Sequence, residues 1–250
     1  PFFLEGAGLF DVGIPGTSSR RPPPLLLFYS RRIGLAEGRA IPIITGGKVT
    51  GKVGPYGVGF LNVFTDAFHT DSSVTEESDI VDEPRTNYTV LRLKRDLFRG
   101  SSVGLIAINK QMLGSPSSSE DTDSYNRAGG LDFVYRPKPN LDIRGLWART
   151  SEPDVSEQND AFYVSTAWRS KNFTMEGLYT DIGENFNPKV GFIRQKGVRQ
   201  LGGQFRYTPW LNKSGFSKLG IRRAWIGPEL DFIFDRDNEL ETREITFSNF

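Results

Sequence analysis

Apolar and charged side chains alternate through residues 127–150, and this pattern constrains the fold most strongly. In the first half, Leu131 and Phe133 flank Asp132, and the alternation resumes after the break at 137–140. Alternation with a period of two places the two sets of side chains on opposite faces of a strand. The short break contains Pro and Asn and predicts a hairpin turn. Each arm has about ten residues, which exceeds the usual soluble strand and matches a tilted strand that crosses a bilayer.

Similar alternation recurs along the chain and predicts an all-β protein without helices. We expect about twelve strands, at 25–33, 41–53, 56–64, 87–98, 102–112, 127–136, 141–150, 161–169, 173–181, 197–208, 219–235 and 240–250. Arg95 falls on an apolar face, and we expect its long stem to carry the charge past a strand end.

The expected connections alternate in length. The short ones are 54–55, 99–101, 137–140 and 170–172, and the long ones are 67–86, 113–126, 151–160 and 182–196. Short turns at one end and long loops at the other are typical of outer-membrane barrels. The rhythm weakens at 209–219 and 236–239. The prediction is therefore an antiparallel transmembrane β-barrel of the outer-membrane type, formed by 25–250 and preceded by an irregular lead-in or plug at 1–24.

Composition excludes several classes of function. The chain has 250 residues and a formal net charge of +1, so it has no general basic field for nucleic acid. It contains no cysteine, which excludes disulfides and thiolate metal sites. Its single histidine, His69, leaves little scope for histidine-based metal or acid–base chemistry. The mean hydropathy of −0.38 resembles that of a soluble protein, but the alternating strands of a membrane barrel give similar averages. The first residue is Pro1 and no leader is recognisable, so we expect a mature chain or a fragment.

Alternation alone does not separate a membrane barrel from a soluble two-sheet sandwich, in which the apolar face would be the core. Strand length, loop rhythm and aromatic residues near strand ends favour the barrel. Charged residues would then face the lumen: Lys48, Lys52, Arg92, Lys94, Asp96, Asp132, Arg136, Asp142, Arg144, Glu176, Arg206, Glu229 and Asp231. Aromatic residues would lie at the lipid interface: Tyr56, Tyr88, Trp147, Trp168, Tyr179, Tyr207 and Trp225.

The expected lumen carries charges of both signs, which allows two interpretations. One is a ladder of side chains that neutralise each other across strands. The other is a hydrated channel that selects solutes by charge. The mixed signs favour the ladder, because they indicate no preference for one ion.

Several stretches resemble a bacterial family whose members are described as carbohydrate-binding family 9-like domain proteins and end in a large domain of unknown function. The matching stretches are 1–6, 27–34, 47–52, 84–89, 126–133 and 187–192, so the resemblance covers most of the chain. It implies a Gram-negative outer-membrane β-barrel, with a sugar-binding domain upstream that this chain lacks. The family's C-terminal domain is usually longer, so we expect further strands beyond Phe250. The family offers no catalytic residues that can be transferred to this chain.

Other motifs carry little chemistry. Residues 46–53 approach the phosphate-loop pattern, but Val53 stands where Ser or Thr is required and the segment is an expected strand. The acidic stretch 235–239 lacks the glycine and spacing of a calcium loop, and a solvated turn is favoured. Asp132 and Asp142 could suggest a glycosidase pair, but Arg136 and Arg144 are close enough in sequence to neutralise them. We therefore expect no catalytic residues, no metal and no cofactor.

Three functions remain open. The first is an outer-membrane channel, transporter or anchor linked to carbohydrate binding or uptake. The second is a non-conducting scaffold subunit of a larger envelope complex, with the lead-in as a plug. The third is a soluble all-β carbohydrate-processing enzyme. The expected partners are outer-membrane lipid, oligosaccharide through the missing domain and envelope-complex subunits, with no nucleic acid.

Overall fold

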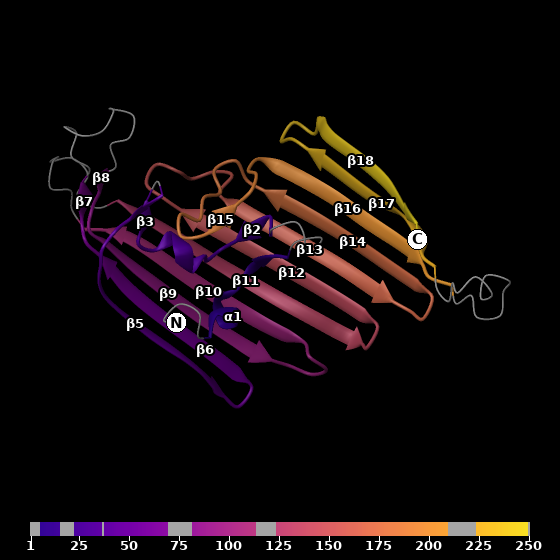
Figure 1. Cartoon of the computed structure of the whole chain (residues 1–250), viewed down its shortest axis with the longest axis horizontal. Coiled ribbons are helices and arrows are strands. Elements are labelled where there is room, and N and C mark those ends of the chain that lie inside the picture. Colours follow the sequence, from indigo (N-terminus) through magenta and orange to yellow (C-terminus); the bar gives the residue numbers. More distant parts are fainter. Residues whose placement is uncertain are drawn as a thin grey trace.

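The computed structural model describes residues 6–15, 23–36, 38–69, 82–113, 124–209 and 224–249. Its main element is a sheet of 11 strands, in which every neighbouring pair is antiparallel (Figure 1). From one edge to the other the strands are β5 (Ile43–Val53), β6 (Tyr56–Thr65), β9 (Thr86–Asp96), β10 (Ser102–Met112), β11 (Tyr125–Lys138), β12 (Leu141–Ser151), β13 (Asp160–Arg169), β14 (Phe173–Ile182), β16 (Val198–Tyr207), β17 (Ile226–Phe234) and β18 (Leu240–Asn249). The all-β antiparallel fold expected from the alternation is thus confirmed. Within the described residues the sheet is open, because β5 and β18 each have one hydrogen-bonded neighbour.

The expected connection rhythm is largely present. Tight turns join β5 to β6, β9 to β10, β11 to β12 and β13 to β14, and we call this end of the sheet the turn end. Longer segments join the strands at the opposite end, which we call the loop end. The two exceptions are those noted in the sequence: 208–225 is long at the turn end, and 235–239 is short at the loop end. No helix among the described residues is long and apolar enough to cross a membrane.

The expected first strand at 25–33 is wrong. The structure has only the two-residue β2 (Leu25–Leu26) there, followed by a short 3-10 helix, η1 (Ser30–Arg32). Leu25 and Leu27 are both 0% exposed. Their alternation therefore reflects packing onto the large sheet rather than membership of it.

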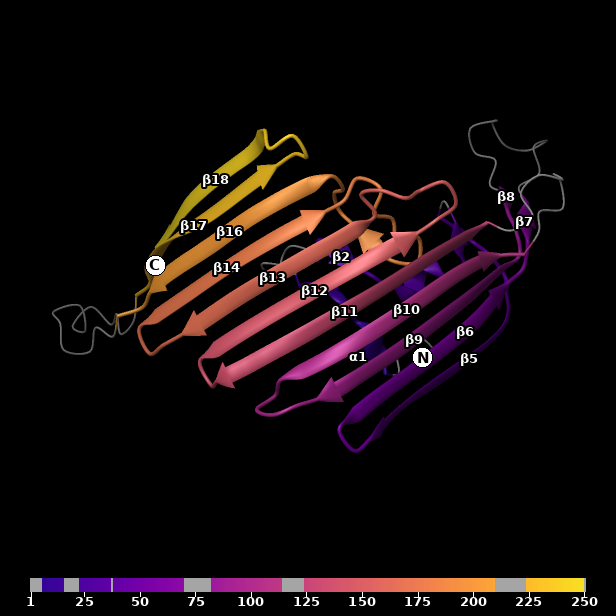
Figure 2. The same cartoon turned by 180° about the vertical axis from the view of Figure 1, so that it is seen from behind.

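The N-terminal elements lie on one face of the large sheet (Figure 1). They are α1 (Ala7–Phe10), β1 (Gly13–Ile14) and β2, and β2 also pairs with β15 (Phe192–Ile193) from the expected long loop at 182–196. We call this the covered face. The opposite, bare face carries no other element in the described structure (Figure 2). Two small hairpins complete the fold: β3 (Leu35–Ala36) with β4 (Arg39–Ala40), and β7 (Phe68–His69) with β8 (Asp82–Glu83).

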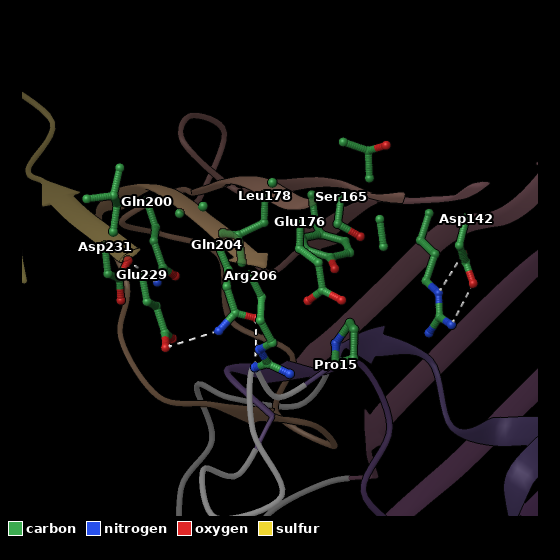
Figure 3. A pocket seen from close by; sticks show the side chains of 18 of the residues that line it. Pro15, Asp142, Ser165, Glu176, Leu178, Gln200, Gln204, Arg206, Glu229 and Asp231 are labelled. Carbon is green, nitrogen blue, oxygen red and sulfur yellow. Dashed lines mark hydrogen bonds and ion pairs between the residues drawn. The ribbon is translucent and has the colours of Figure 1, made fainter. Parts of the chain in front are cut away.

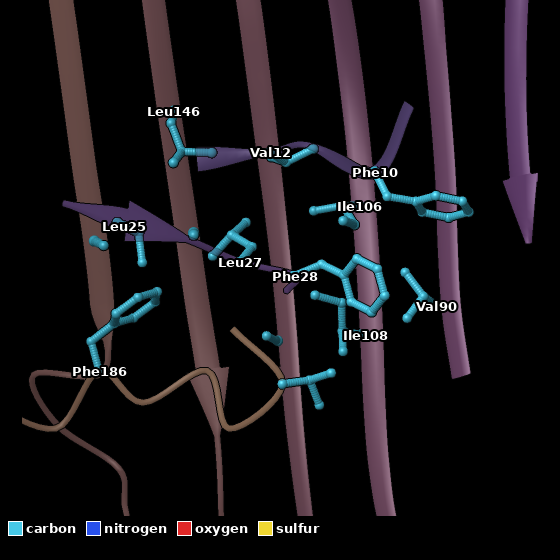
Figure 4. Close-up of a cluster of buried hydrophobic side chains, with 14 of the residues drawn as sticks. Phe10, Val12, Leu25, Leu27, Phe28, Val90, Ile106, Ile108, Leu146 and Phe186 are labelled. Carbon is cyan, nitrogen blue, oxygen red and sulfur yellow. The ribbon is translucent and has the colours of Figure 1, made fainter. Parts of the chain in front are cut away.

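The main hydrophobic core lies between the N-terminal elements and the covered face. Phe10, Leu27 and Phe28 pack over Val90 and Ile106 of the sheet (Figure 4). Phe186, from the segment that carries β15, is also fully buried in this cluster. The core occupies the half of the covered face nearer the loop end.

A glycine makes the close approach of the N-terminal segment possible. A Cβ atom at Gly130 would lie 2.6 Å from Cδ1 of Leu27. We expect Gly130→Ala to lower the free energy of unfolding by about 1–2 kcal/mol, because an overpacked core must shift its side chains. Gly177→Ala is the matched control, since its Cβ would be 3.8 Å from Thr166 and in ordinary contact. Urea unfolding of both variants measures the difference, and equal stability of the two would contradict this packing.

Candidate functional site

All thirteen charged residues expected in the lumen project from the covered face. The strand register shows this, because directly opposed residues on paired strands point to the same face of the sheet. Arg92 is opposite Ile106 of the buried core. Lys94 is opposite Gly104, which is opposite Asp132, and Asp132 is opposite Leu146 in the same core. Glu176 is likewise opposite Gln204, which is opposite Glu229. Most of these charges lie in the half of the face nearer the turn end, beyond the edge of the core.

Arg92 joins the sheet to the N-terminal segment. Its side chain is only 3% exposed, and its two terminal nitrogens donate to the two carboxylate oxygens of Asp132. Its Nε donates to the carbonyl oxygen of Leu9 over 3.1 Å. Gly104 leaves room for this guanidinium, because a Cβ there would lie 2.5 Å from its nitrogens. Arg92 therefore satisfies a carboxylate and a backbone carbonyl at the border of the core.

Further ion pairs lie toward the turn end, within one strand, between adjacent strands or across one intervening strand. Asp142 accepts hydrogen bonds from Arg136 at 3.0 and 3.1 Å and from Arg144 at 3.0 and 3.1 Å. Arg169 pairs with Glu176, and Lys52 pairs with Asp96. These contacts are the kind that a neutralising charge ladder contains. Both carboxylates of the suggested glycosidase pair are thus held by arginines. Asp142 is held by the expected Arg136 and Arg144, whereas Asp132 is held by Arg92.

A polar hollow of about 400 Å³ opens on the covered face over β12–β18 (Figure 3). Its lining includes residues that the sequence analysis did not select: Pro15, Tyr163, Ser165, Arg169, Gln200, Gln204, Glu244 and Thr246. Most of these lie at the inward positions of their strands, so the same alternation could have identified them. No pattern in the sequence indicated that Pro15 of the N-terminal segment would reach this hollow.

Glutamines orient the charged groups at one side of the hollow (Figure 3). Gln204 accepts a hydrogen bond from Arg206 at 3.2 Å and donates to Glu229 at 3.5 Å. Gln200 donates to Asp231 at 2.7 Å. The guanidinium of Arg206 also lies 5.0 Å over the ring of Trp225, and its Nε is buried without a hydrogen-bond partner among the described residues. Carboxylates, an arginine and amides thus face one polar space, which is suited to binding a hydrated polar solute.

Most of the expected interface aromatics point away from the covered face. Trp147, Trp168 and Tyr179 are on the bare face and are 36–45% exposed. Tyr56 and Tyr207 are also on that face at the turn end, where Arg95 stacks over Tyr56 at 5.4 Å. That contact places Arg95 beside a strand end, as expected from the sequence.

Two aromatic assignments are wrong. Tyr88 is 4% exposed and lies opposite Val63 on the covered face, so it belongs to the core rather than to an outer girdle. Tyr88 is two residues before Val90 on the same strand, so both side chains point to the covered face. The sequence analysis considered only that Tyr88 is near a strand end. Trp225 precedes β17 and stacks with inward-facing Arg206.

The two remaining sequence motifs, 46–53 and 235–239, are a strand and a turn in the structure. Residues 46–53 lie within β5, and 235–239 form a turn closed by hydrogen bonds between Asp235 and Glu239. No group of three or more acidic, His or Cys side chains in the described residues is arranged to hold a metal ion. Residues 1–5 and 16–22 of the expected lead-in, 76–81 of the long loop 67–86 and 219–223 of the expected strand 219–235 lie outside the described residues. The chain matches no model of a protein family, no curated protein and no solved structure.

Proposed function

We propose that this chain forms the wall of an outer-membrane β-barrel that anchors a protein in the membrane. The observation that carries the proposal is a row of large apolar side chains on the bare face. Val58, Leu93, Leu105, Leu131, Trp147 and Phe162 are opposed in register across six neighbouring strands. Each of them is 40–47% exposed.

Water is a poor solvent for such a surface. Soluble monomers rarely expose continuous apolar patches larger than a few hundred Å², and this row is only part of the apolar bare face. Other members are Phe60, Leu91, Val103, Phe133, Tyr135, Met175, Leu201, Phe205, Leu230 and Ile245. Strands of 9–14 residues are long enough to carry this face across hydrocarbon. A two-sheet sandwich would bury the same residues, whereas Leu93 and Phe133 are 44% and 42% exposed.

Membrane insertion imposes a requirement on the sheet edges. Unpaired backbone N–H and C=O groups are costly in hydrocarbon, so β5 and β18 need partners there. Because the 11 strands alternate in direction, β5 and β18 run the same way. Closure with antiparallel seams throughout therefore requires an odd number of additional strands. The proposal includes such strands, and the resemblance to a family with a longer C-terminal domain supports them.

The covered face favours an anchor over an open channel. A barrel closed around this face would enclose the N-terminal elements and the segment around Phe186, which fill its loop-end half with packed apolar side chains. A non-conducting scaffold of an envelope complex would have the same interior. The resemblance suggests that a sugar-binding domain is the anchored part.

Transport is the second candidate, and the polar hollow favours it. The hollow lies at the turn end of the covered face and contains oriented groups of both signs. If the N-terminal elements moved, a polar path could connect the two ends of the barrel. The third possibility, a soluble enzyme, has no comparable support, because Asp132 and Asp142 are held by arginines.

Membrane fractionation followed by gel electrophoresis tests the proposed anchor. We expect the full-length protein in the membrane fraction, solubilised by detergent. We also expect its unheated band to migrate differently from its boiled band, because a folded barrel resists denaturation by cold detergent. Recovery in the aqueous fraction with a single band position would refute the proposal.

Planar-bilayer recording separates the anchor from the transporter. We expect the purified protein to insert without steady conductance, because the packed core blocks one half of the interior. Stable open currents from the unmodified protein would favour the transporter instead. Gly130→Ala provides a useful variant, since its added methyl would meet Leu27 of the N-terminal segment most closely and should raise the frequency of brief openings if the segment acts as a gate.

A further inference from the structure

A second groove lies on the bare face at the loop end. It has a volume of about 880 Å³, and its lining includes Leu91, Ala107, Arg127, Gly129 and Arg149. Residues 155, 156 and 159 of the loop between β12 and β13 also line the groove. The groove therefore lies where the proposed hydrocarbon surface meets the headgroup region.

Two arginines in this groove are held by neutral partners. The Nε of Arg127 donates to Oδ1 of Asn109 at 3.2 Å, and the Nε of Arg149 donates to Oδ1 of Asn159 at 3.1 Å. Arg127 also stacks over Tyr125 at 4.4 Å. Neither arginine forms an ion pair with a described residue, although Asp160 is opposite Arg149 in register. Holding each guanidinium through Nε leaves its terminal nitrogens available for an anion.

The two arginines are close neighbours on adjacent strands. Arg127 is opposite Ser151 and Gly129 is opposite Arg149, so the two guanidiniums start from diagonal positions on one face. Diagonal positions on paired strands are within reach of long side chains. Guanidinium groups bind phosphate through paired, charge-assisted hydrogen bonds. This placement is suited to one phosphate held between two arginines.

Below the arginines the groove is apolar and open. Gly129 has no side chain, and a Cβ there would have only one atom within 4 Å, at 3.9 Å. Leu91 and Ala107 continue the lining toward Leu105 and Leu131 of the bare face. An acyl chain could lie along this surface while its headgroup remains at the arginines. Free phosphate would use only the charged part of the groove.

We propose that this groove binds the headgroup of a phosphate-bearing membrane lipid, with phosphate on Arg127 and Arg149 and an acyl chain over Leu91, Ala107 and Gly129. The inference rests on the proposed membrane location and adds a specific lipid site to it. Charge complementarity selects the headgroup, and the apolar floor selects a lipid over a soluble anion.

Native mass spectrometry of the full-length protein in detergent tests this site. The probes are dioleoylphosphatidylglycerol and dioleoylglycerol, which share acyl chains and differ in the phosphate headgroup. We expect the phosphatidylglycerol adduct to be at least about tenfold more stable, and the double variant Arg127→Gln/Arg149→Gln to lose that preference, as expected for the loss of charge-assisted hydrogen bonds. Arg95→Gln is the matched control, because it removes an arginine from the same face at the turn end and should retain the preference.

Three outcomes would overturn the lipid site. They are equal binding of the two lipids, an unchanged preference in the double variant, and complete displacement of the lipid by inorganic phosphate. The last would mean that the apolar floor contributes nothing and that the groove binds a free anion. Membrane fractionation of the double variant keeps the two proposals separate. If the variant remains in the membrane but the lipid preference is absent from the unmodified protein, only the lipid site fails.

Discussion

Leu105→Arg is expected to lower the free energy of unfolding in lipid vesicles by about 2–4 kcal/mol, the cost of an arginine near the middle of a barrel's lipid face. Leu105 is near the middle of β10, and its neighbours in register are Leu93 and Leu131. It is already 42% exposed and has no covering element in the described structure. On a face that contacts water, the same substitution would change stability by only about 0.5 kcal/mol. The substitution therefore distinguishes lipid from water at one position.

Val103→Arg is the matched control for this experiment. Val103 is on the same face of the same strand and is 43% exposed, but it lies at the turn end. The cost of arginine falls to about 0–1 kcal/mol near the membrane interface. Urea titration in vesicles, monitored by tryptophan fluorescence, measures both variants. Equal and negligible effects at the two positions would contradict a lipid-facing sheet.

Arg92→Met is expected to destabilise the protein by about 3 kcal/mol, near the lower end of the range for breaking a buried ion pair. The substitution leaves Asp132 without its bidentate partner and removes the hydrogen bond to Leu9. Asp132 keeps a side-chain exposure of 22%, so water offsets part of the loss. The N-terminal segment should also become more accessible to protease, because Arg92 is one of its contacts with the sheet.

Two further variants isolate the effect of the buried pair. Arg92→Met/Asp132→Leu should recover part of the lost stability, because replacement of both partners leaves no unpaired charge. Lys52→Met should cost less than about 1 kcal/mol, since Lys52 and Asp96 form an exposed pair with side-chain exposures of 64% and 44%. An Arg92→Met variant as stable as Lys52→Met would show that the Arg92 contact does not secure the N-terminal segment.

The sequence was sufficient to predict the strands of the large sheet, because period-two alternation depends only on local geometry. It also predicted that Leu93, Phe133 and Trp147 would lie on the face opposite the charged residues, because successive side chains of a strand point to opposite faces. It failed at Leu25–Ile33, where the same alternation came from packing a short segment across other strands. No local pattern distinguishes a strand within a sheet from an extended segment lying on it.

The candidate sites were predictable only in part. Inward charges such as Asp142 followed from strand parity, and its partners Arg136 and Arg144 belong to the same predicted hairpin. The partner of Asp132 was not predicted, because Arg92 lies on β9, two strands away from β11 in the sheet. Tyr88 was assigned to the lipid interface because it is near a strand end. It lies instead in the core, because the covered face is apolar at the loop end and polar only toward the turn end. The pairing of Arg127 with Asn109 and of Arg149 with Asn159 depends on side-chain geometry that alternation does not encode.

Fluorescence quenching of Trp147 tests the central claim most directly. The sample is a variant with Trp147 as its single tryptophan, with Trp168, Trp210 and Trp225 replaced by phenylalanine, reconstituted in vesicles. If the bare face contacts lipid, brominated acyl chains should quench Trp147 strongly and aqueous iodide should quench it weakly. Strong quenching by iodide with little effect of the brominated lipid would place this face in water and contradict the account.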